Sequence, residues 1–483
     1  MNIAELLFDR AREYPGQTAL LDGETVLSYA RLEELSRTVS EELVRILPGC
    51  VPGGVQARIG LFWPNAWEYV VLALGILRAG ACLIPVAEEL TPAERESQTR
   101  LTAVHLLISP ASSQSGVEGR VEAQNQGWVE GSIRWQWTVL QSRPEFPEER
   151  FLAVRPAFIR FSSGTTGDSK GVVLGHAALL ERVRSANRRL GIGREDRVLW
   201  TLPMAHHFAV SIVLYLLEGA TTVLEKAHLA ADILETARRT GATVIYGSPF
   251  HHALLAAEPS GLPWPTLRLA VSTASSLREE TARAFHARFG VPLCQGLGII
   301  EAGLPLLNDA PLEKPLSVGK PDDFQLRVVR EDGTLCGPGE AGELQVRGPG
   351  LFDAYLLPWT ERAELDGWFS TGDLVEQDSA GYIFIRGRRK SVINFGGMKF
   401  FPEEVEAVLC RHPQVAECRV SGEPHEQWNQ IPVAEVVPAD PLSKLGAAAL
   451  SKHCRAWIAS YKVPVRFRFV DELPRTASGK IKR

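Results

Sequence analysis

The sequence lacks the features that mark secreted and nucleic-acid-binding proteins. It contains no close pair of cysteines, and its seven cysteines are scattered along 483 residues. Isolated cysteines of this kind exclude a disulfide framework and a zinc-ribbon site, and they indicate reduced thiols in a cytoplasmic protein. The net charge of −5 excludes the basic excess that a nucleic-acid partner usually requires.

Long apolar stretches are absent as well. The most apolar run, residues 69–86, is broken by Arg78 and by glycine and proline residues. We therefore interpret it as a buried helix followed by a strand, and we expect no membrane span. The N-terminus has no basic start followed by an apolar stretch, so it predicts an amphipathic helix ending at Pro15-Gly16 and not a signal peptide.

What the sequence does contain is a repeated strand–helix–strand pattern. Residues 58–62 form an apolar strand, Asn65 can cap a helix over about 66–79, and a second strand starts at Ala81. The same pattern recurs over residues 231–247 and 268–290. It predicts an α/β fold in which parallel strands are joined by helices.

The pattern changes near residue 320. Residues 324–348 alternate apolar and polar side chains around Asp-Gly and Pro-Gly pairs, which predicts antiparallel hairpins and a small β-barrel-like part. Beyond residue 389 the expected helices and strands form an α+β set. We therefore predict a large N-terminal domain of mixed βαβ-type sheets over residues 1–389 and a small, mobile C-terminal domain over residues 390–483.

The segment SSGTTGDSKG, residues 162–171, lies between two apolar strands. Its glycines allow backbone amides to surround an anion, its hydroxyls add donors, and Lys170 adds a positive charge. These properties suit a polyphosphate, although the spacing is not that of the GxxxxGK[ST] nucleotide loop. A flexible Gly/Ser linker is the alternative interpretation of the segment taken alone.

Three further segments argue against a linker: GWFSTGDL (367–374), with Asp373 after a Thr-Gly turn, GRRKSVINFGGMKFFPEEVE (387–406) and LPRTASGKIKR (473–483). In order and spacing, the four segments resemble those of the adenylate-forming superfamily, which includes acyl-CoA synthetases, carrier-loading adenylation domains and beetle luciferases. The resemblance covers essentially the whole chain. It implies that a carboxylate attacks the α-phosphate of ATP and that a thiol then displaces AMP.

The resemblance assigns candidate residues to the phosphates and the metal. The residues that it implies at the phosphates of ATP are Ser162, Ser163, Gly164, Thr165, Thr166, Gly167 and Lys170, and it implies Gly298 as a further ATP- or AMP-binding residue. Glu301 matches the glutamate that helps to hold Mg²⁺, with Thr166 beside it, and oxygen ligands of this kind suit that ion. Without the surrounding match, Glu301 would be an ordinary exposed acid.

The resemblance also implies roles for residues nearer the C-terminus. Asp373 and Arg388 match the pair that binds the ribose hydroxyls, because a carboxylate can accept two hydrogen bonds at once. Lys480 matches the lysine that reaches the reacting oxygens during adenylation, and Lys390 occupies the hinge position. Gly396 and Gly397 match the position where a pantetheine arm passes, although the pair alone predicts only a turn.

The acid is expected to bind near two other segments. In LPMAHHFAVSI (202–212), His206 matches a position near the carboxylate, and a core histidine is an equally weighted alternative. No acid stands where amino-acid-activating relatives carry an aspartate, which argues against an α-amino acid substrate. The residues implied at the acyl pocket are His207, Ser272, Thr273, Ala274 and Leu297.

The acyl-pocket segments also indicate the kind of acid. Thr273 and Ala274 replace glycines of the family pattern and narrow an apolar pocket. We therefore expect an aryl or short-to-medium acyl acid. The segment before Glu301 departs further from the family, since Leu297 replaces an aromatic residue and Ile300 a threonine. Isoleucine cannot donate a hydrogen bond, and losing one to a charged group costs about 1.5–3 kcal/mol. Either another donor compensates or ATP turnover is slow.

The expected function is ATP- and Mg²⁺-dependent activation of a small carboxylic acid, followed by transfer to coenzyme A. One alternative is loading of the acid onto the phosphopantetheine of a separate carrier protein. A second is an adenylate-binding protein with weak catalysis, which Ile300 favours and Lys480 disfavours. A luciferase-type oxygenase has no positive signal, and the sequence leaves the oligomeric state open.

Overall fold

A computed structural model of the protein describes residues 2–113, 115–117, 124–129, 133–140, 143–161, 171–227, 229–273, 277–396, 398–440, 445–475 and 481–482, with backbone alone at 124–129 and 399. The chain divides into two units. The first comprises Met1–Pro315, Asp322–Phe324 and Arg347–Gly367, and the second Leu316–Pro321, Gln325–Val346 and Trp368–Arg483. Residues 389 and 390 both lie in the second unit, so the domain boundary expected between them stays a prediction.

The first unit contains an eight-stranded sheet whose central strands are parallel. Its order is β15-β14-β13-β12-β10-β11-β1-β2, and β2 and β15 join the two edges antiparallel. The strands are β1 (Thr18–Asp22), β2 (Thr25–Ser28), β10 (Arg197–Trp200), β11 (Thr221–Leu224), β12 (Val244–Gly247), β13 (Leu269–Ser272), β14 (Leu293–Ile299) and β15 (Gly303–Leu307). The predicted parallel strands are therefore confirmed.

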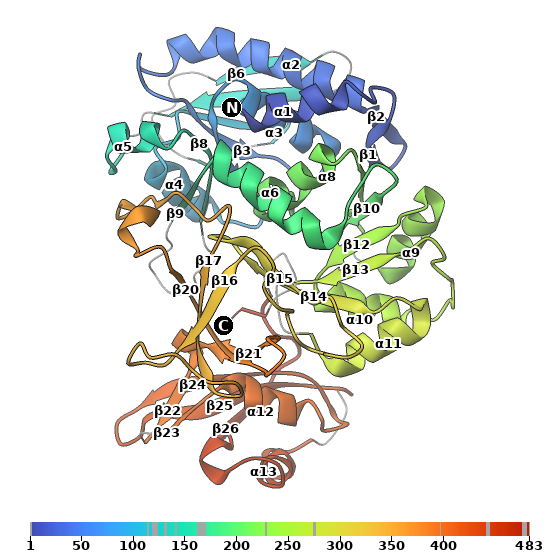
Figure 1. The fold of residues 1–483 in the computed structure, drawn as a ribbon, viewed down its shortest axis with the longest axis vertical. Helices are drawn as coiled ribbons and strands as arrows, with labels where there is room; N and C mark the ends of the chain where they lie inside the picture. The colour runs from blue at the N-terminus through green and yellow to red at the C-terminus, as the bar shows by residue number, and fades with distance from the viewer. Residues whose placement is uncertain are drawn as a thin grey trace. The chain divides into compact units, whose positions relative to one another are not determined.

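Three helices lie beside one end of this sheet (Figure 1): α9 (Ala230–Thr240), α10 (Pro249–Ala257) and α11 (Glu279–Phe289). Their apolar faces bury Ile233, Leu255 and Phe285 against Ile245 and Ala270 of the strands. Gly241 and Gly290 end α9 and α11 in the left-handed conformation, which glycine adopts without strain. The apolar pattern of α9 and α11 and the glycine at the end of each helix are thus consistent with each other, as the sequence predicts.

A nine-stranded mixed sheet forms the rest of the first unit, in the order β19-β18-β9-β8-β4-β3-β5-β7-β6. Its members β3, β4, β5 and β8 are parallel to their neighbours among these four strands. The strands are β3 (Arg58–Phe62), β4 (Cys82–Val86), β5 (Leu106–Pro110), β6 (Gln124–Val129), β7 (Ile133–Val139), β8 (Pro156–Phe161), β9 (Gly171–Gly175), β18 (Ala354–Tyr355) and β19 (Thr360–Glu361). The mixed α/β fold class is confirmed.

Helix α3 (Trp67–Arg78) begins differently from the prediction. Its N-cap is Ala66, which makes no side-chain capping bond, so the assignment of Asn65 as the cap is wrong. Asn65 instead donates to the carbonyl of Leu202 (3.0 Å) and accepts from the N–H of Met204 (2.7 Å). A distant segment therefore takes the polar groups of Asn65, which a local sequence pattern cannot reveal.

The other helices of the first unit are α1 (Ile3–Ala11), α2 (Tyr29–Ile46), α4 (Pro92–Leu101), α5 (Glu148–Ala153), α6 (His176–Leu190), α7 (Met204–His207) and α8 (Val213–Leu217). A π-helical turn, Phe208–Ile212, joins α7 to α8. The expected first helix is present as α1 but ends at Ala11, before Pro15. Among the helices of the described ranges, none combines the length and apolarity needed to cross a membrane.

The second unit contains two smaller sheets. The region expected to be barrel-like holds a four-stranded sheet of β16 (Gln325–Val329), β17 (Ala341–Arg347), β20 (Phe369–Gln377) and β21 (Ile383–Arg388), in that order. A five-stranded sheet follows, with β22 (Ile393–Phe395), β23 (Met398–Phe400), β24 (Val415–His425), β25 (Asn429–Pro438) and β26 (Arg466–Phe469). Helices α12 (Pro402–Leu409) and α13 (Ala447–Arg455) supply Val405 and Leu450 to its core.

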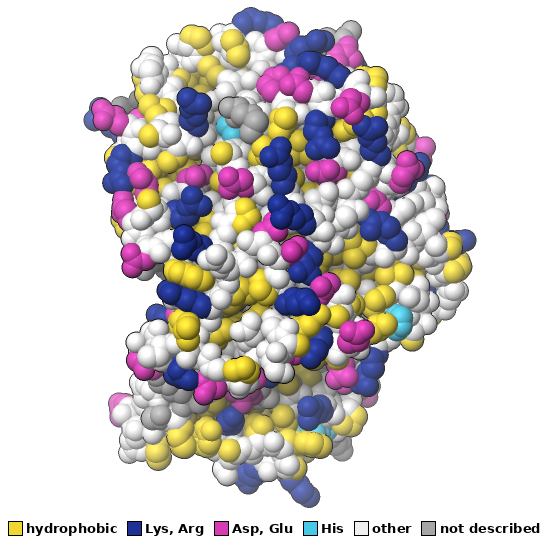
Figure 2. Space-filling model, in the orientation of Figure 1, with side chains coloured by type: hydrophobic (Ala, Val, Ile, Leu, Met, Phe, Trp, Pro, Cys, Tyr) yellow, Lys and Arg dark blue, Asp and Glu magenta, His cyan; other side chains and the backbone are white. Residues whose placement is uncertain are grey.

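One face of the molecule shows how its charged side chains are distributed. On the face drawn in Figure 2, lysine and arginine side chains are interspersed with aspartate and glutamate. This distribution agrees with the small net charge of −5.

Candidate active site

The predicted phosphate-binding segment lies mostly outside the described residues, and its flanks are well defined. Strands β8 and β9 pair antiparallel, with Phe161 opposite Gly171. The prediction that the segment connects two strands is therefore confirmed. The predicted site residues that lie outside the described part of the chain are Ser162, Ser163, Gly164, Thr165, Thr166, Gly167, Lys170, Ala274, Gly397 and Lys480.

Glu301, the predicted metal ligand, follows the end of β14 and is held by three neighbours. The hydroxyl of Tyr355 donates to its Oε1 atom (3.2 Å). The carbonyl of Glu301 accepts from the N–H of Phe352 (2.7 Å) and from the guanidinium of Arg182 (3.3 Å). Burial, together with the charge and the hydrogen bond of Glu301, raises the pKa of Tyr355, so the phenol keeps its proton as a donor.

Arg182, from helix α6, organises the backbone around Glu301. Its guanidinium is fully buried and donates to the carbonyls of Ile300 (3.0 Å) and Gly350 (2.6 Å) as well as to that of Glu301. Burial lowers its pKa to about 10, although the charges of Asp353 and Glu301 oppose the shift. The arginine therefore remains charged at neutral pH and fixes the loop that carries Glu301.

Glu301 fits a magnesium ion that is also bound by phosphates. Mg²⁺ is commonly held by one or two carboxylates together with phosphates and water, so one well-placed carboxylate suffices. Within the described residues there is no group of three or more His, Cys, Asp or Glu side chains that could hold a metal ion without other ligands. The donor set thus suits a metal that arrives with a nucleotide.

His206 pairs with a carboxylate that the sequence analysis did not single out. Its Nε2 atom, in α7, is hydrogen-bonded to Oε1 of Glu89, which follows β4. Burial alone would raise the pKa of Glu89, but the hydrogen bond and charge of His206 and the charge of Arg160 lower it. The His206 side chain is 30% exposed, so it is not a core histidine.

His207 faces an aromatic group. Its ring packs edge-on against Trp200 at 5.5 Å, and Trp200 stacks on Tyr246 at 5.9 Å. Burial, followed by the charges of Arg160 and His206, lowers the pKa of His207 well below its usual value. His207 is therefore neutral at physiological pH, and its role at the acyl pocket stays a prediction.

Tyr246 connects this group to the other predicted acyl-pocket segment. Its hydroxyl is hydrogen-bonded to Thr273, whose Oγ1 atom would lie 3.2 Å from a Cβ placed on Gly298. Leu297 and Ser272 are buried in the adjoining strands, and the hydroxyl of Ser272 has no hydrogen-bond partner. The described residues predicted for the acyl pocket therefore lie in or directly after the neighbouring strands β13 and β14, and they include polar groups.

Asp373 and Arg388, the predicted ribose pair, lie directly opposite each other on β20 and β21. Nε of Arg388 is 2.6 Å from Oδ1 of Asp373. The Asp373 side chain is only 3% exposed, whereas that of Arg388 is 50% exposed. The predicted Thr-Gly turn before Asp373 is wrong, because Thr371 and Gly372 continue β20, with Gly372 at a φ of +74°.

The predicted hinge and acceptor residues lie farther along the second unit. Lys390 is exposed in a short 3-10 helix, Arg389–Ser391, whose Arg389 pairs with Glu343 at 2.8 Å. Gly396 donates its N–H to the carbonyl of Trp428 (2.8 Å) and has a φ of +58°. A Cβ at Gly396 would lie 2.8 Å from the Trp428 ring, so this turn requires glycine.

Arg160 is a charged residue of this region that the sequence analysis missed. It stands near the end of β8, two residues before the predicted phosphate-binding segment. Burial lowers its pKa to about 10, opposed by the charges of Glu301, Tyr69 and Glu89. A lone arginine in the apolar strand PAFIRF was the signal that could have identified it.

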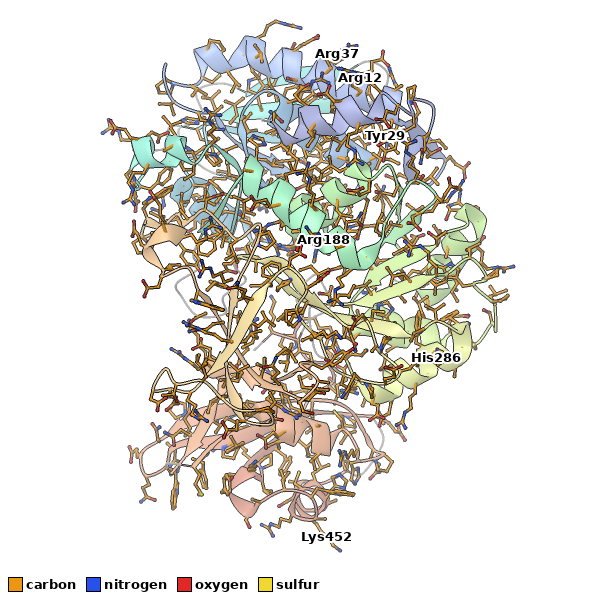
Figure 3. The ribbon with its side chains drawn as sticks, in the orientation of Figure 1. Arg12, Tyr29, Arg37, Arg188, His286 and Lys452 are labelled. Atoms are coloured by element: carbon orange, nitrogen blue, oxygen red, sulfur yellow. The ribbon has the colours of Figure 1, made fainter. Side chains whose placement is uncertain are left out.

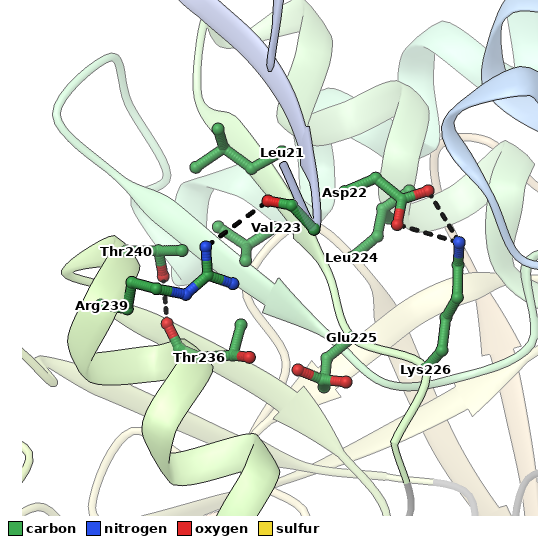
Figure 4. A pocket seen from close by; sticks show the side chains of 10 residues that line it. Leu21, Asp22, Val223, Leu224, Glu225, Lys226, Thr236, Arg239 and Thr240 are labelled. Atoms are coloured by element: carbon green, nitrogen blue, oxygen red, sulfur yellow. Dashed lines mark hydrogen bonds and ion pairs between the residues drawn. The ribbon is translucent and has the colours of Figure 1, made fainter. Parts of the chain in front are cut away.

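A cavity of about 160 Å³ lies elsewhere in the first unit (Figure 4). Its charged groups are engaged with the protein itself. Lys226 pairs with Asp22 at 2.9 Å, and Asp22 also accepts from the N–H of Trp67 (3.1 Å). These bonds connect β1 to the start of α3, so the cavity walls serve the fold.

Two family matches together cover most of the chain. Residues 7–356 match the family described as AMP-binding enzyme, and residues 404–480 match the AMP-binding enzyme C-terminal domain. Sulfoacetate–CoA ligase of Cupriavidus necator is 29% identical over 100% of this chain and 96% of its own length. 2-Succinylbenzoate–CoA ligase of Bacillus licheniformis is 30% identical, with 99% and 98% covered. Indoleacetate–CoA ligase of Aromatoleum aromaticum is 30% identical, with 100% and 97% covered.

Solved structures agree with these matches. The o-succinylbenzoate CoA synthetase of Bacillus subtilis, in complex with its acyl-adenylate intermediate, superposes with a TM-score of 0.82 at 26% identity, covering 99% of this chain and 96% of that one. The same enzyme in complex with ATP and magnesium gives a TM-score of 0.81 at 26% identity, with 99% and 98% covered. The similarity therefore extends over both units of the chain.

Proposed function

Because this chain belongs to the family of AMP-binding enzymes, we propose that it activates a carboxylic acid with ATP and transfers the acyl group to coenzyme A. The observation that carries the proposal is the chain-long similarity to several acid–CoA ligases. One solved relative holds an acyl-adenylate, the intermediate that this reaction requires.

The reaction has two steps. In the first, a carboxylate oxygen forms a bond to the α-phosphorus of ATP, and the bond to the leaving pyrophosphate breaks with its electron pair. In the second, the thiolate sulfur of coenzyme A bonds to the acyl carbon, and AMP leaves with the electrons of the acyl–oxygen bond. Magnesium, when bound, neutralises charge on the phosphates.

The described residues support the first step by position and charge. Glu301 is the candidate magnesium ligand, and Arg182 and Tyr355 fix its backbone and carboxylate. Asp373, whose carboxylate is buried, pairs with the half-exposed guanidinium of Arg388, and this pair suits the two ribose hydroxyls. Lys480 and the 162–170 segment are proposed for the reacting and leaving phosphate oxygens.

We propose an aryl or short-to-medium acyl acid as the substrate. The side chain of Thr273 adjoins Gly298 and narrows the space there, while Trp200 and Tyr246 present aromatic faces. The relatives named above act on acids of very different size and charge, so the acid is identified only by experiment. A cytoplasmic location, inferred from the scattered cysteines, also stays a prediction.

The test is ATP–pyrophosphate exchange with a panel of aryl, dicarboxylic and fatty acids, followed by AMP release with and without coenzyme A. We expect exchange with at least one acid and AMP release that increases when coenzyme A is added. If AMP release requires a carrier protein, the acceptor is that carrier protein and not coenzyme A. Exchange with palmitate alone would contradict the proposed acid class, and no exchange with any acid would contradict the function.

A further inference from the structure

Three largely or fully buried arginines of the first unit differ in their bonding. Arg58 pairs with Glu148 at 2.6 Å and donates to the carbonyl of Ala103 (2.8 Å). Arg182 donates to three backbone carbonyls. Arg160 is largely buried, yet its Nε atom, which has no contact with solvent, has no hydrogen-bond partner. Buried guanidinium groups are normally paired, so the bonding of Arg160 is incomplete.

The charge of Arg160 acts on groups of the candidate active site. Its guanidinium interacts electrostatically with Glu301 and Glu89, and its charge in turn acts on His207. Glu89 is hydrogen-bonded to His206, and Glu301 accepts from Tyr355. The two nearby carboxylates therefore have other partners, which leaves the guanidinium able to bind an additional anion.

The segment directly before Glu301 offers no side chain that could donate a hydrogen bond to such an anion. Residues 297–300, directly before Glu301, are leucine, glycine and two isoleucines, and none of these side chains can donate a hydrogen bond. The carbonyls of Ile300 and Glu301 accept from Arg182, so that arginine is already occupied. Among the side chains that the structure describes around Glu301, Arg160 is the cation with an unfilled donor.

We propose that Arg160 donates to the anionic oxygens at the reacting centre, where the carboxylate of the acid meets the α-phosphate, and thereby supplies the donor that Ile300 lacks. This inference rests on the proposed function. Negative charge on these oxygens is greatest while the oxygen–phosphorus bond forms and the bond to pyrophosphate breaks. Arg160 keeps its protons throughout, because it stabilises charge and transfers none.

The test compares Arg160→Met with wild type in ATP–pyrophosphate exchange, using an acid that the wild-type enzyme accepts. We expect the exchange rate to fall about 10- to 150-fold, since a hydrogen bond to a charged group is lost. Arg160→Lys, which retains the charge but not the forked donor, should lose less. Transfer to coenzyme A from a supplied acyl-adenylate should change little, because the oxygen–phosphorus bond is already formed.

The second arm restores a donor at another position. Adding Ile300→Thr to Arg160→Met places a hydroxyl directly before Glu301 and should recover part of the exchange rate. Arg37→Met is the matched control, because Arg37 is exposed on α2, as labelled in Figure 3. It should leave both steps unchanged, and thermal denaturation of each variant separates a folding defect from a catalytic one.

Several outcomes would overturn the inference while leaving the proposed function intact. One is equal exchange by wild type and Arg160→Met. Another is the absence of any recovery in the double variant. A third is a loss confined to acids with a second anionic group, which would assign Arg160 to acid selection. If wild type itself exchanges with no acid, the proposed function fails instead.

Discussion

Asp373 depends on one cross-strand neighbour for its position. Its register opposite Arg388 brings a carboxylate that is almost fully buried within 2.6 Å of a guanidinium that is half exposed. Such a pair can hold a carboxylate oxygen in place while a ligand approaches from the exposed side. This geometry is compatible with the ribose role that the family resemblance implies for Asp373.

We predict that Asp373→Asn lowers kcat/KM for ATP about 10- to 150-fold, because an amide cannot accept two strong hydrogen bonds from the ribose. ATP–pyrophosphate exchange measures the effect, and titration of AMP measures binding alone. Glu376→Gln is the matched control on the same strand, where Glu376 pairs with Arg386 at 2.6 Å. Equal kinetics for the two variants would remove Asp373 from the site.

Individual site residues were predictable to different degrees. Glu301, Asp373 and Arg388 belong to continuous motifs, so the sequence could identify them and the structure then paired the last two. Glu89 and Arg160 belong to no motif. Glu89 becomes notable through its hydrogen bond to His206, and Arg160 stands out in the sequence only as a lone arginine in the apolar strand PAFIRF. Their importance comes from spatial proximity that residue spacing does not encode.

At the scale of elements, α2 and α3 approach each other closely at Gly75. A Cβ added there would lie 2.5 Å from Cγ1 of Val39 and 3.1 Å from the carbonyl oxygen of Ser36. Glycine weakens a helix by about 1 kcal/mol relative to alanine, so its presence in the middle of α3 needs a packing reason. The contact with α2 supplies that reason.

We therefore expect Gly75→Ala to lower the free energy of unfolding by roughly 1–2 kcal/mol, because overpacking outweighs the gain in helix propensity. Urea denaturation measures the change. Combining it with Val39→Ala should give less than the sum of the two single losses, since the removed methyl groups make room. Gly49→Ala, where a Cβ meets nothing within 4 Å, serves as the control. Strictly additive losses would contradict the contact.

At the scale of the whole molecule, buried histidines connect stability to pH. Burial lowers the pKa of His105, His176 and His252 to about 4. His252 is fully buried, with its Nε2 atom 3.0 Å from the carbonyl of Val271. In the unfolded chain these rings take up a proton near pH 6.5, so the unfolded state binds more protons between pH 6.5 and 4.

The free energy of unfolding should therefore be greatest above pH 6.5, fall as the pH decreases toward 4, and level off below it with respect to these groups. His252→Gln removes at most one proton from the difference between the two states. The slope of the free energy of unfolding against pH should therefore decrease by at most about 1.4 kcal/mol per pH unit. Urea unfolding at several pH values measures it. Added salt should change the slope little, because burial is the main cause of the shift. An unchanged slope in the variant would contradict a neutral His252.

The proposed two-step reaction gives a prediction for Lys480. We expect Lys480→Ala to abolish adenylation yet largely spare thiol transfer from a supplied acyl-adenylate, because the lysine is needed only while charge builds on the α-phosphate. Exchange and thioester formation are measured separately. Lys482→Ala, two residues away, is the control. Equal loss of both steps would contradict the assignment.

By itself the sequence determined the α/β class, most helices and strands, and the motifs that specify ATP chemistry. These features are local: apolar periodicity identifies the elements, and the glycine, hydroxyl and lysine residues of 162–171 predict a phosphate loop. Tertiary structure alone decided that Asn65 binds a distant segment, that His206 pairs with Glu89, and that the charge of Arg160 acts on Glu301 and Glu89. Such contacts join residues that are far apart in the chain. The strength of these contacts depends on burial in the folded protein and not on the spacing of the residues in the sequence.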